Sequence, residues 1–161
     1  MKRVYIETTI PSAYCDLRAA PEMVARRNWT RRWWDECRAN YELVTSAAVI
    51  EELARGVHLR SRERLQLVKG LPLLAADPQI LEIVEVYIER NVMPSDPAGD
   101  ALHLALASFH KCDVLLTWNC KHLANYAKFD HIRRINTLLG LHVPLLLTPL
   151  ELMGEGGKDE A

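Results

Sequence analysis

Short apolar runs alternate with longer stretches of helical pattern along most of this chain. Five of these runs have the composition of buried strands, at residues 3–6, 42–45, 71–75, 113–117 and 143–147. Parallel strands need a crossover connection long enough to hold a helix, whereas antiparallel strands can be joined by a short turn. The regular alternation therefore predicts an α/β fold with a mainly parallel sheet.

Capping residues mark where the intervening helices begin and end. We expect helices over 21–40, from Ser46 toward Gly56, over 60–69, from Asp77 to about Arg90, after Asp96 and Pro97, briefly near His122, and over 128–139. Ser46 and Asp77 belong to the residue types that cap helix N-termini. Gly56 and Gly140 are placed to end helices.

The length and composition fit one domain with a substantial core. The chain has 161 residues, and 49% of them are hydrophobic, which is enough to bury a core of ordinary size. Neither an internal repeat nor a linker divides the sequence. We expect a single domain over 1–152, followed by a glycine-rich, charged tail at 153–161 that is disordered.

Charge and hydropathy exclude several classes of protein. The formal net charge is -1, so no global basic field attracts nucleic acid, and any such site must be local. The sequence has no apolar run near the roughly 20 residues of a membrane span, and its N-terminus lacks the pattern of a signal peptide. The four cysteines form no C-x-x-C pair. We therefore expect a cytoplasmic protein with reduced thiols and no membrane partner.

Acidic side chains lie close to the ends of the predicted strands. Glu7 follows the first strand, Glu52 lies on the helix after the second, and Asp100 opens the helix before the fourth. Ligands of open parallel sheets bind outside the carboxyl ends of the strands, so these side chains can converge. Clustered carboxylates repel one another unless a cation lies between them. Oxygen ligands with few histidines suit Mg²⁺ or Mn²⁺, which can activate water for attack on a phosphodiester.

Some of these residues also have a purely structural interpretation. Glu7 can complement the dipole of a helix over 9–15, and Thr8 and Thr9 can cap that helix. The sequence S-D-P is a helix-start signature, which favours a capping role for Asp96.

Other positions leave a choice between two roles. Glu51 and Glu52 point about 100° apart on a helix, so only one can face a site, and the glycine four residues further on favours Glu52. His103 fits a packed or hydrogen-bonded histidine better than a ligand. Asn119 is either a turn residue or a site residue. The arginines and tryptophans within 26–34 can grip RNA or form a buried stripe, and their helical spacing favours the core.

Four blocks of the sequence carry a more specific pattern. They are VYIETTIPS (4–12), TSAAVIEELARG (45–56), GDALHLALASFHKCDVLLTWNCKHLAN (99–125) and the closing strand with TPLEL (148–152). In order and spacing they resemble the PIN domains, and within that family the VapC-like toxin ribonucleases. The resemblance implies a three-layer α/β/α sandwich around a short, mainly parallel central sheet. It also implies an acidic pocket that binds Mg²⁺ or Mn²⁺, and hydrolysis of RNA.

Matching positions to the family pattern implies a set of site residues. The implied catalytic residues are Glu7, Glu52, Asp100 and Asn119, of which Glu7, Glu52 and Asp100 bind the metal. Further pocket or substrate contacts are expected from Thr9, Asp96, Lys121 and His122. Two positions differ from the family pattern. Glu7 stands where the first acid is normally Asp, and His122 stands where a further Asp often follows.

The resemblance implies a metal-dependent ribonuclease that is the toxin of a toxin–antitoxin pair. Its products would carry a 5′-phosphate and a 3′-hydroxyl, and its partners would be RNA, a second copy of the chain in a homodimer, and a small antitoxin protein. One alternative is a non-catalytic PIN-fold module that binds RNA or protein and has a degenerate metal pocket. Another alternative is a metal-dependent phosphatase that acts on small molecules.

Overall fold

The computed structural model describes residues 1–55, 60–94 and 99–159. Five strands form one sheet: β1 (Arg3–Ile6), β2 (Glu42–Ser46), β3 (Leu73–Leu74), β4 (Val114–Leu116) and β5 (Leu145–Leu147). Their order across the sheet is β3-β2-β1-β4-β5, and every neighbouring pair is parallel. All five predicted strands are present, although several are shorter than predicted, and the α/β prediction is confirmed.

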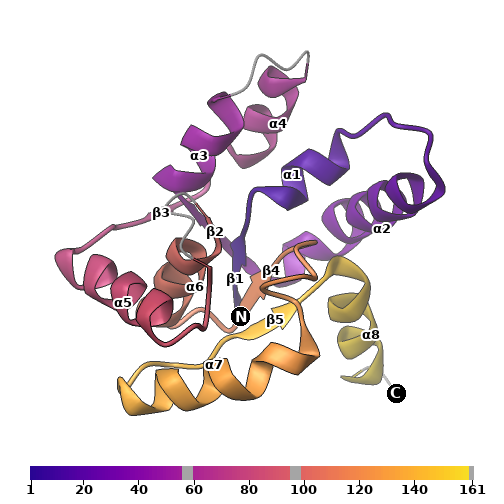
Figure 1. Cartoon of the computed structure of the whole chain (residues 1–161). Helices are drawn as coiled ribbons and strands as arrows, with labels where there is room; N and C mark the ends of the chain where they lie inside the picture. The colour runs from indigo at the N-terminus through magenta and orange to yellow at the C-terminus, as the bar shows by residue number, and fades with distance from the viewer. Residues whose placement is uncertain (56–59, 95–98, 160–161) are drawn as a thin grey trace.

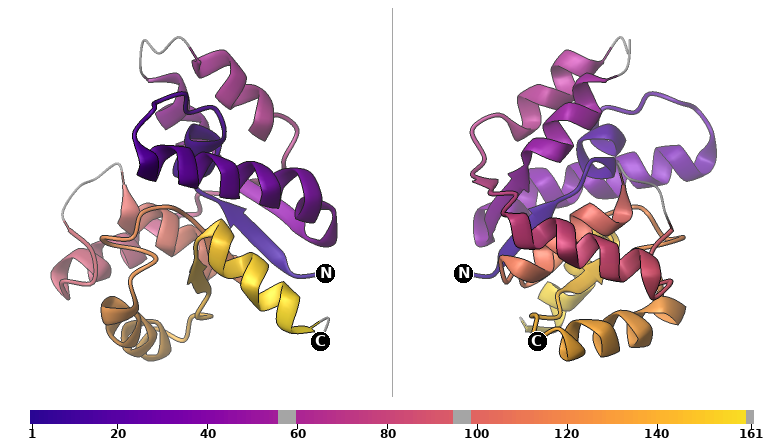
Figure 2. Two further views of the ribbon diagram at one scale, coloured as in Figure 1. Left: turned by 90° about the vertical axis from the view of Figure 1, so that its right-hand side faces the viewer. Right: turned by 60° about the vertical axis from the view of Figure 1, so that its left-hand side comes forward.

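Helices cover both faces of this sheet. They are α1 (Thr9–Tyr14), α2 (Pro21–Cys37), α3 (Ala47–Ala54), α4 (Ser61–Val68), α5 (Pro78–Glu89), α6 (Asp100–Phe109), α7 (Tyr126–Leu138) and α8 (Pro149–Asp159), with a short 3-10 helix η1 (Arg38–Asn40) after α2. Helices α1 to α4 and α8 lie on one side, and α5, α6 and α7 lie on the other (Figure 1, Figure 2). Right-handed crossovers require this division for α1 to α7 once the strand order is set. The predicted three-layer sandwich is confirmed.

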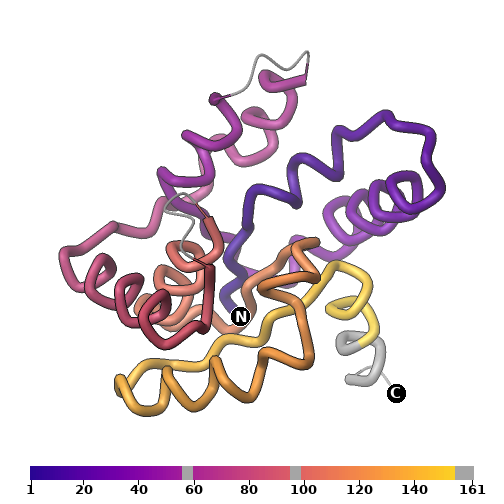
Figure 3. Tube along the Cα trace, viewed as in Figure 1, coloured from indigo at the N-terminus to yellow at the C-terminus, as the bar shows by residue number. Residues whose placement is uncertain are grey.

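The chain leaves the two central strands in opposite directions. From β1 it continues through α1 and α2 to β2, whereas from β4 it continues through α7 to β5, as the trace in Figure 3 shows. β1 and β4 are neighbours in the sheet. Where neighbouring parallel strands diverge in this way, a crevice opens outside their carboxyl ends, and ligands of such sheets bind there. The fold therefore places its candidate site directly after Ile6 and Leu116.

The core surrounds the two central strands. Val4, Tyr5 and Ile6 of β1 are fully buried, as are all three residues of β4. Strands that helices cover on both faces carry continuous apolar runs rather than alternating ones, which explains why the sequence pattern located them. Helix α6 is also buried along nearly its whole length, with Leu104 and Leu106 among its core residues.

Two expected helix signals have other roles in the structure. Ser46 occupies the N-cap position of α3, but its side chain makes no capping hydrogen bond; its hydroxyl instead pairs with that of Tyr5 at 2.7 Å. The short helix expected near His122 is wrong, because this segment forms a turn. The backbone N–H groups of Lys121 and His122 donate to the side-chain oxygen of Asn119. These bonds resemble those of a helix N-cap, but the segment does not continue into a helix.

The remaining boundaries differ in smaller ways. The helix predicted over 21–40 is α2 followed by η1. Helix α8 continues to Asp159, past residue 152 where a disordered tail was predicted, so the backbone there is helical; the domain boundary itself stays a prediction. Gly56 and the start signal at Asp96 and Pro97 lie outside the described residues. Within the described ranges, none of the helices has the length and apolar character that a membrane crossing requires.

A buried polar cluster joins the three helices on one side of the sheet. Asn136 of α7 is fully buried. Its Oδ1 accepts from the Tyr87 hydroxyl of α5 at 2.6 Å, and its Nδ2 donates to Ser108 Oγ of α6 at 2.9 Å and to the His142 carbonyl oxygen at 3.0 Å. Burial raises the pKa of Tyr87 to about 12, so the phenol stays protonated and keeps donating.

We predict that Asn136→Ala lowers the free energy of unfolding by about 3 kcal/mol, because it leaves several buried polar groups without their partner. The neighbouring Thr137→Ala is the matched control. Thr137 is exposed, so this change is expected to stay within about 0.5 kcal/mol of the original protein. Urea unfolding of both variants measures the difference, and equal losses would contradict a structural role for the cluster.

Candidate metal centre

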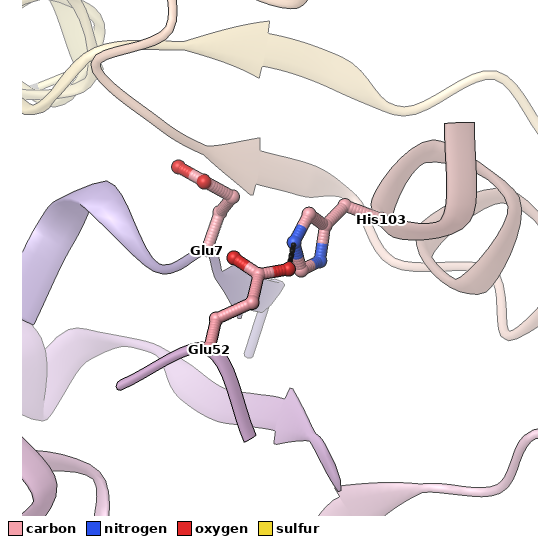
Figure 4. A group of neighbouring side chains, drawn as sticks. All are labelled: Glu7, Glu52 and His103. Atoms are coloured by element: carbon pink, nitrogen blue, oxygen red, sulfur yellow. Dashed lines mark hydrogen bonds and ion pairs between the residues drawn. The ribbon is translucent and has the colours of Figure 1, made fainter. Parts of the chain in front are cut away.

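Three side chains from three different elements meet at the carboxyl edge of the sheet. Glu7 follows β1, Glu52 lies on α3, and His103 lies on α6. Each offers a metal-ligating atom, and these atoms all lie within 4.8 Å of one another. Figure 4 shows the three side chains together, with the interaction between Glu52 and His103 marked. The chain therefore has a compact set of donors at the place that the topology favours for a ligand.

Glu7 is held by two threonines. The residue is only 4% exposed, and its Oε1 accepts from the Thr9 backbone N–H at 3.1 Å, from the Thr9 hydroxyl, and from the Thr117 hydroxyl at 2.6 Å. Each hydroxyl in turn accepts from a backbone N–H, Thr9 from Trp118 at 2.8 Å and Thr117 from Asn119 at 2.9 Å. Because these N–H groups occupy the acceptor side of each hydroxyl, both hydroxyl protons point to Glu7. Glu7 therefore makes the predicted contact with the N-terminus of α1, through the Thr9 backbone N–H. The two threonine hydroxyls are further donors to its carboxylate.

A chain of hydrogen bonds holds Glu52 and His103. The Thr8 hydroxyl donates to Glu52 Oε2 at 2.6 Å, and Glu52 Oε1 lies 2.8 Å from His103 Nε2. On the other side of the imidazole ring, Nδ1 lies 2.7 Å from the Tyr5 hydroxyl, which also pairs with Ser46 at 2.7 Å. The ring is 1% exposed. The buried Tyr5 therefore fixes one side of the ring, and the ring fixes Glu52 in turn.

The acids around His103 determine its charge. Burial by itself lowers the pKa of His103, but the hydrogen bond to Glu52 and the charges of Glu7, Glu52 and Asp100 outweigh burial and raise this pKa overall. Burial raises the pKa of Glu52, and the hydrogen bond and charge of His103 outweigh it and lower this pKa overall. The two directions agree: Glu52 and His103 share a proton that resides on the imidazole ring.

A second pair lies beside these three residues. Asn119 Nδ2 donates to Asp100 Oδ1 at 2.8 Å, which restrains the Asp100 carboxylate. Lys121 and His122 contact Asn119 through their backbone N–H groups. Asp96, the remaining predicted pocket residue, lies outside the described residues.

The donor set fits a divalent cation. The donors to Glu7 are two hydroxyls and one amide, so this buried carboxylate is stabilised by neutral groups. Two carboxylates and an imidazole ring are ligand types that Mn²⁺ and similar transition ions accept, and the carboxylates also suit Mg²⁺. A cation at this place would compensate the negative charge that the hydrogen bonds only disperse.

The residues predicted to bind metal are only partly brought together, because Glu7 and Glu52 lie in the group of donors and Asp100 does not. Glu7 and Glu52 come together as expected, and Glu51 is exposed. His103, Thr8 and Thr117 were not assigned to the site. A histidine inside an Ala- and Leu-rich helix was the one available signal, and it was interpreted as packing.

We predict that the Glu52–His103 pair makes stability depend on pH when EDTA keeps metal away. Because folding raises the pKa of His103 above its ordinary value of 6.5, the protonated ring stabilises the folded protein fully at pH below 6.5. This contribution is lost as the pH rises through the raised pKa of the folded state. Because folding lowers the pKa of Glu52 below its ordinary value of 4.5, the ionised carboxylate stabilises the folded protein fully at pH above 4.5. This contribution is lost as the pH falls through the lowered pKa of the folded state. The pair therefore stabilises most between these two values.

Urea unfolding of the original protein and of His103→Gln over a range of pH measures this contribution. The stability difference is expected to shrink as pH rises above 6.5. Glu52→Gln removes the other half of the pair and is expected to give the same trend. A difference that is constant with pH would show that the pair is not ionised.

Comparison with known proteins agrees with this arrangement. No curated protein and no solved structure matches the chain. The family model of the PIN domain matches residues 5–128, most of the chain, and this range includes every residue of the centre. PIN domains are generally nucleases that use divalent metal ions and bind RNA. From the extent of this match, together with the parallel sheet, the chain belongs to the PIN domain family.

Proposed function

We propose that this protein is a metal-dependent endoribonuclease that uses Mg²⁺ or Mn²⁺. The observation that carries the proposal is the convergence of Glu7, Glu52 and His103 donor atoms within 4.8 Å, in a member of a family of metal-dependent nucleases. In the proposed reaction, water attacks the phosphorus of an RNA phosphodiester and the 3′-oxygen leaves with a proton. The products carry a 5′-phosphate and a 3′-hydroxyl.

Each residue of the centre has a separate part in the proposal. When bound, the cation lowers the pKa of a coordinated water and stabilises negative charge on the phosphate. Glu7 and Glu52 would hold it, and Thr8, Thr9 and Thr117 keep both carboxylates in place. Such supporting hydrogen bonds orient metal ligands and tune their basicity.

Asp100 is the third acid of the proposed site. Its charge contributes to the raised pKa of His103, although Asp100 does not belong to the group whose donor atoms lie within 4.8 Å of one another. Asn119 donates to one of its oxygens, which fixes the carboxylate toward the end of β4. We propose that Asp100 adds a metal or water ligand and that Asn119 orients it.

The finer biological role is also a proposal. The four sequence blocks that resemble VapC-like toxins support a toxin of a toxin–antitoxin pair, which acts as a homodimer and is blocked by a small antitoxin. Light scattering of the purified protein tests the homodimer. Co-expression with the product of the adjacent reading frame tests the antitoxin, which should copurify and suppress cleavage.

We predict that Glu52→Gln reduces RNA cleavage in Mn²⁺ on the order of 100-fold or more, because it removes an anionic ligand. EDTA is expected to abolish cleavage by the original protein. The control is Glu51→Gln, which makes the same change one residue earlier at an exposed position and should retain activity. Calorimetric titration with Mn²⁺ should show weakened binding for Glu52→Gln alone.

Other outcomes would change the assignment. Full activity of Asp100→Asn would remove Asp100 from the site. RNA binding without cleavage in any divalent metal would favour the non-catalytic binding module, particularly if Glu7→Asp then gained activity. Hydrolysis of a generic aryl phosphate without RNA cleavage would favour a phosphatase.

His103 gives the centre a nitrogen donor, from which a metal preference follows. Mg²⁺ prefers oxygen ligands, whereas Mn²⁺ and later transition ions also accept imidazole. In metal binding, Glu52 and His103 would release the proton that they share. We predict that Mn²⁺ binds at least about tenfold more tightly than Mg²⁺ and that His103→Gln narrows this ratio. Calorimetry measures both affinities, and an unchanged ratio would show that His103 supports Glu52 without binding the metal.

A further inference from the structure

The His103 ring has a partner on each of its two nitrogens. Nε2 lies 2.8 Å from Glu52 Oε1 at the metal centre (Figure 4), and Nδ1 lies 2.7 Å from the Tyr5 hydroxyl in the core. A neutral imidazole carries one proton, so one nitrogen donates and the other accepts. A metal ion binds only a nitrogen that has no proton. The nitrogen that keeps the proton therefore decides whether His103 can contribute a ligand to the centre.

Tyr5 is held rigidly beside this ring. It lies in β1, where its backbone pairs with Val44 of β2 on one side and Leu115 of β4 on the other. The residue is fully buried. Its aromatic ring lies 5.7 Å from the imidazole ring, centroid to centroid, at an interplanar angle of 57°. Because the hydroxyl cannot turn to solvent, its hydrogen bonds must be made with the polar groups that the fold places next to it.

The second partner of the Tyr5 hydroxyl is Ser46, whose Oγ lies 2.7 Å away. Ser46 is only 2% exposed. It occupies the N-cap position of α3, where a serine side chain commonly accepts from a backbone N–H, but its side chain makes no such bond. The Ser46 hydroxyl is therefore directed to Tyr5 instead of the helix. A hydroxyl has one proton and two lone pairs, so Tyr5 can donate to Ser46 and still accept from His103.

These contacts determine which nitrogen of His103 is available. If Nδ1 carries the proton, it donates to Tyr5, Tyr5 donates to Ser46, and Nε2 presents its lone pair to the centre. If Nε2 carries the proton instead, it donates to Glu52 and cannot bind a metal. Metal-bound histidines usually donate their other N–H to a carboxylate, a backbone carbonyl oxygen or a water, which fixes the tautomer. In this protein a buried phenol lies at that position.

We propose that Tyr5, supported by Ser46, is a positioning residue that keeps a proton on Nδ1 of His103 and so presents Nε2 to a divalent cation. This inference rests on the proposed function, because it concerns the same metal centre. It adds a requirement that neither Glu7 nor Glu52 supplies, since both lie on the metal side of the ring. The preference for Mn²⁺ over Mg²⁺ then depends on a residue that does not touch the metal.

Tyr5→Phe tests the proposal, because it removes the hydroxyl and keeps an aromatic ring in the core. A proton on Nδ1 of His103 would then be a buried donor without this partner, which is unfavourable, whereas a proton on Nε2 still has Glu52. We expect Mn²⁺ affinity to fall about tenfold, as when other groups that orient a metal ligand are removed. Mg²⁺ affinity should change much less, since Mg²⁺ prefers oxygen ligands. Calorimetric titration with each metal measures both affinities.

NMR of the imidazole nitrogens reports the tautomer without any measurement of activity. Zn²⁺ is the probe, because it is diamagnetic and accepts both carboxylate and imidazole ligands. In the original protein with Zn²⁺, His103 is expected to carry its proton on Nδ1, and in Tyr5→Phe on Nε2. The His103 signals are identified by their loss in His103→Gln. A change that only loosened the fold would not move the proton from one nitrogen to the other.

Tyr87→Phe is the matched control. It removes the hydroxyl of another fully buried tyrosine, which donates to Asn136 at 2.6 Å in the polar cluster of α5, α6 and α7. This variant is expected to lose stability and to keep its Mn²⁺ affinity.

Ser46→Ala keeps the test valid if Tyr5→Phe does not fold, which circular dichroism reports. Without Ser46, the Tyr5 hydroxyl has only His103 to donate to, and this donation favours the proton on Nε2. Ser46→Ala should therefore weaken Mn²⁺ binding in the same direction.

A double variant tests whether Tyr5 acts through His103. If it does, adding Tyr5→Phe to His103→Gln should weaken Mn²⁺ binding no further, because two residues that act as one unit have non-additive effects. A full additional loss in the double variant would show that Tyr5 acts on the centre by another route and would overturn the proposal.

The outcomes separate this inference from the nuclease proposal. Unchanged Mn²⁺ affinity or an unchanged tautomer in Tyr5→Phe, or equal weakening by Tyr87→Phe, would overturn the role of Tyr5. If the original protein still cleaves RNA in that case, the nuclease proposal survives. If Tyr5→Phe weakens Mn²⁺ binding and moves the proton as expected, but the original protein cleaves RNA in no divalent metal, the role of Tyr5 is supported and the nuclease proposal fails.

Discussion

Glu7 places a negative charge at the end of the central strand, at a position where the residue is almost fully buried. A buried carboxylate is unfavourable unless hydrogen bonds or a cation compensate it. The hydroxyls of Thr9 and Thr117 donate to it, and these threonines lie at the start of α1 and the end of β4. The carboxylate thus ties together the segments that leave the two central strands.

The glutamate at this position matters because of its length. Its carboxylate lies one methylene further from the backbone than that of an aspartate, and it reaches from the end of β1 to Thr117 after β4. Mg²⁺ tolerates a displaced ligand poorly, since it requires near-ideal octahedral geometry. Ions that accept imidazole have another donor available in His103, whose Nε2 lies beside Glu52. The longer acid and the nitrogen donor therefore both support the proposed preference for Mn²⁺ over Mg²⁺.

The sequence predicted those features that depend on local pattern. Continuous apolar runs located β1 and β4 because helices cover both faces of these strands, and the rule for parallel sheets then placed Glu7 at a site. His103 could not be assigned in this way, since its role depends on α6 packing so that its ring faces Glu52, which lies 51 residues earlier. The turn at His122 was predicted as a short helix, because the local sequence does not show that the segment stops after one turn.

The acidic centre by itself repels a phosphodiester substrate. Carboxylates repel phosphate, so such a substrate reaches the centre only if a cation compensates their charge. At physiological salt, exposed charges act over about 8 Å, and a chain with net charge -1 has no long-range attraction for RNA. A cation held by Glu7 and Glu52 would therefore supply, within the centre, the attraction for phosphate that the whole chain lacks.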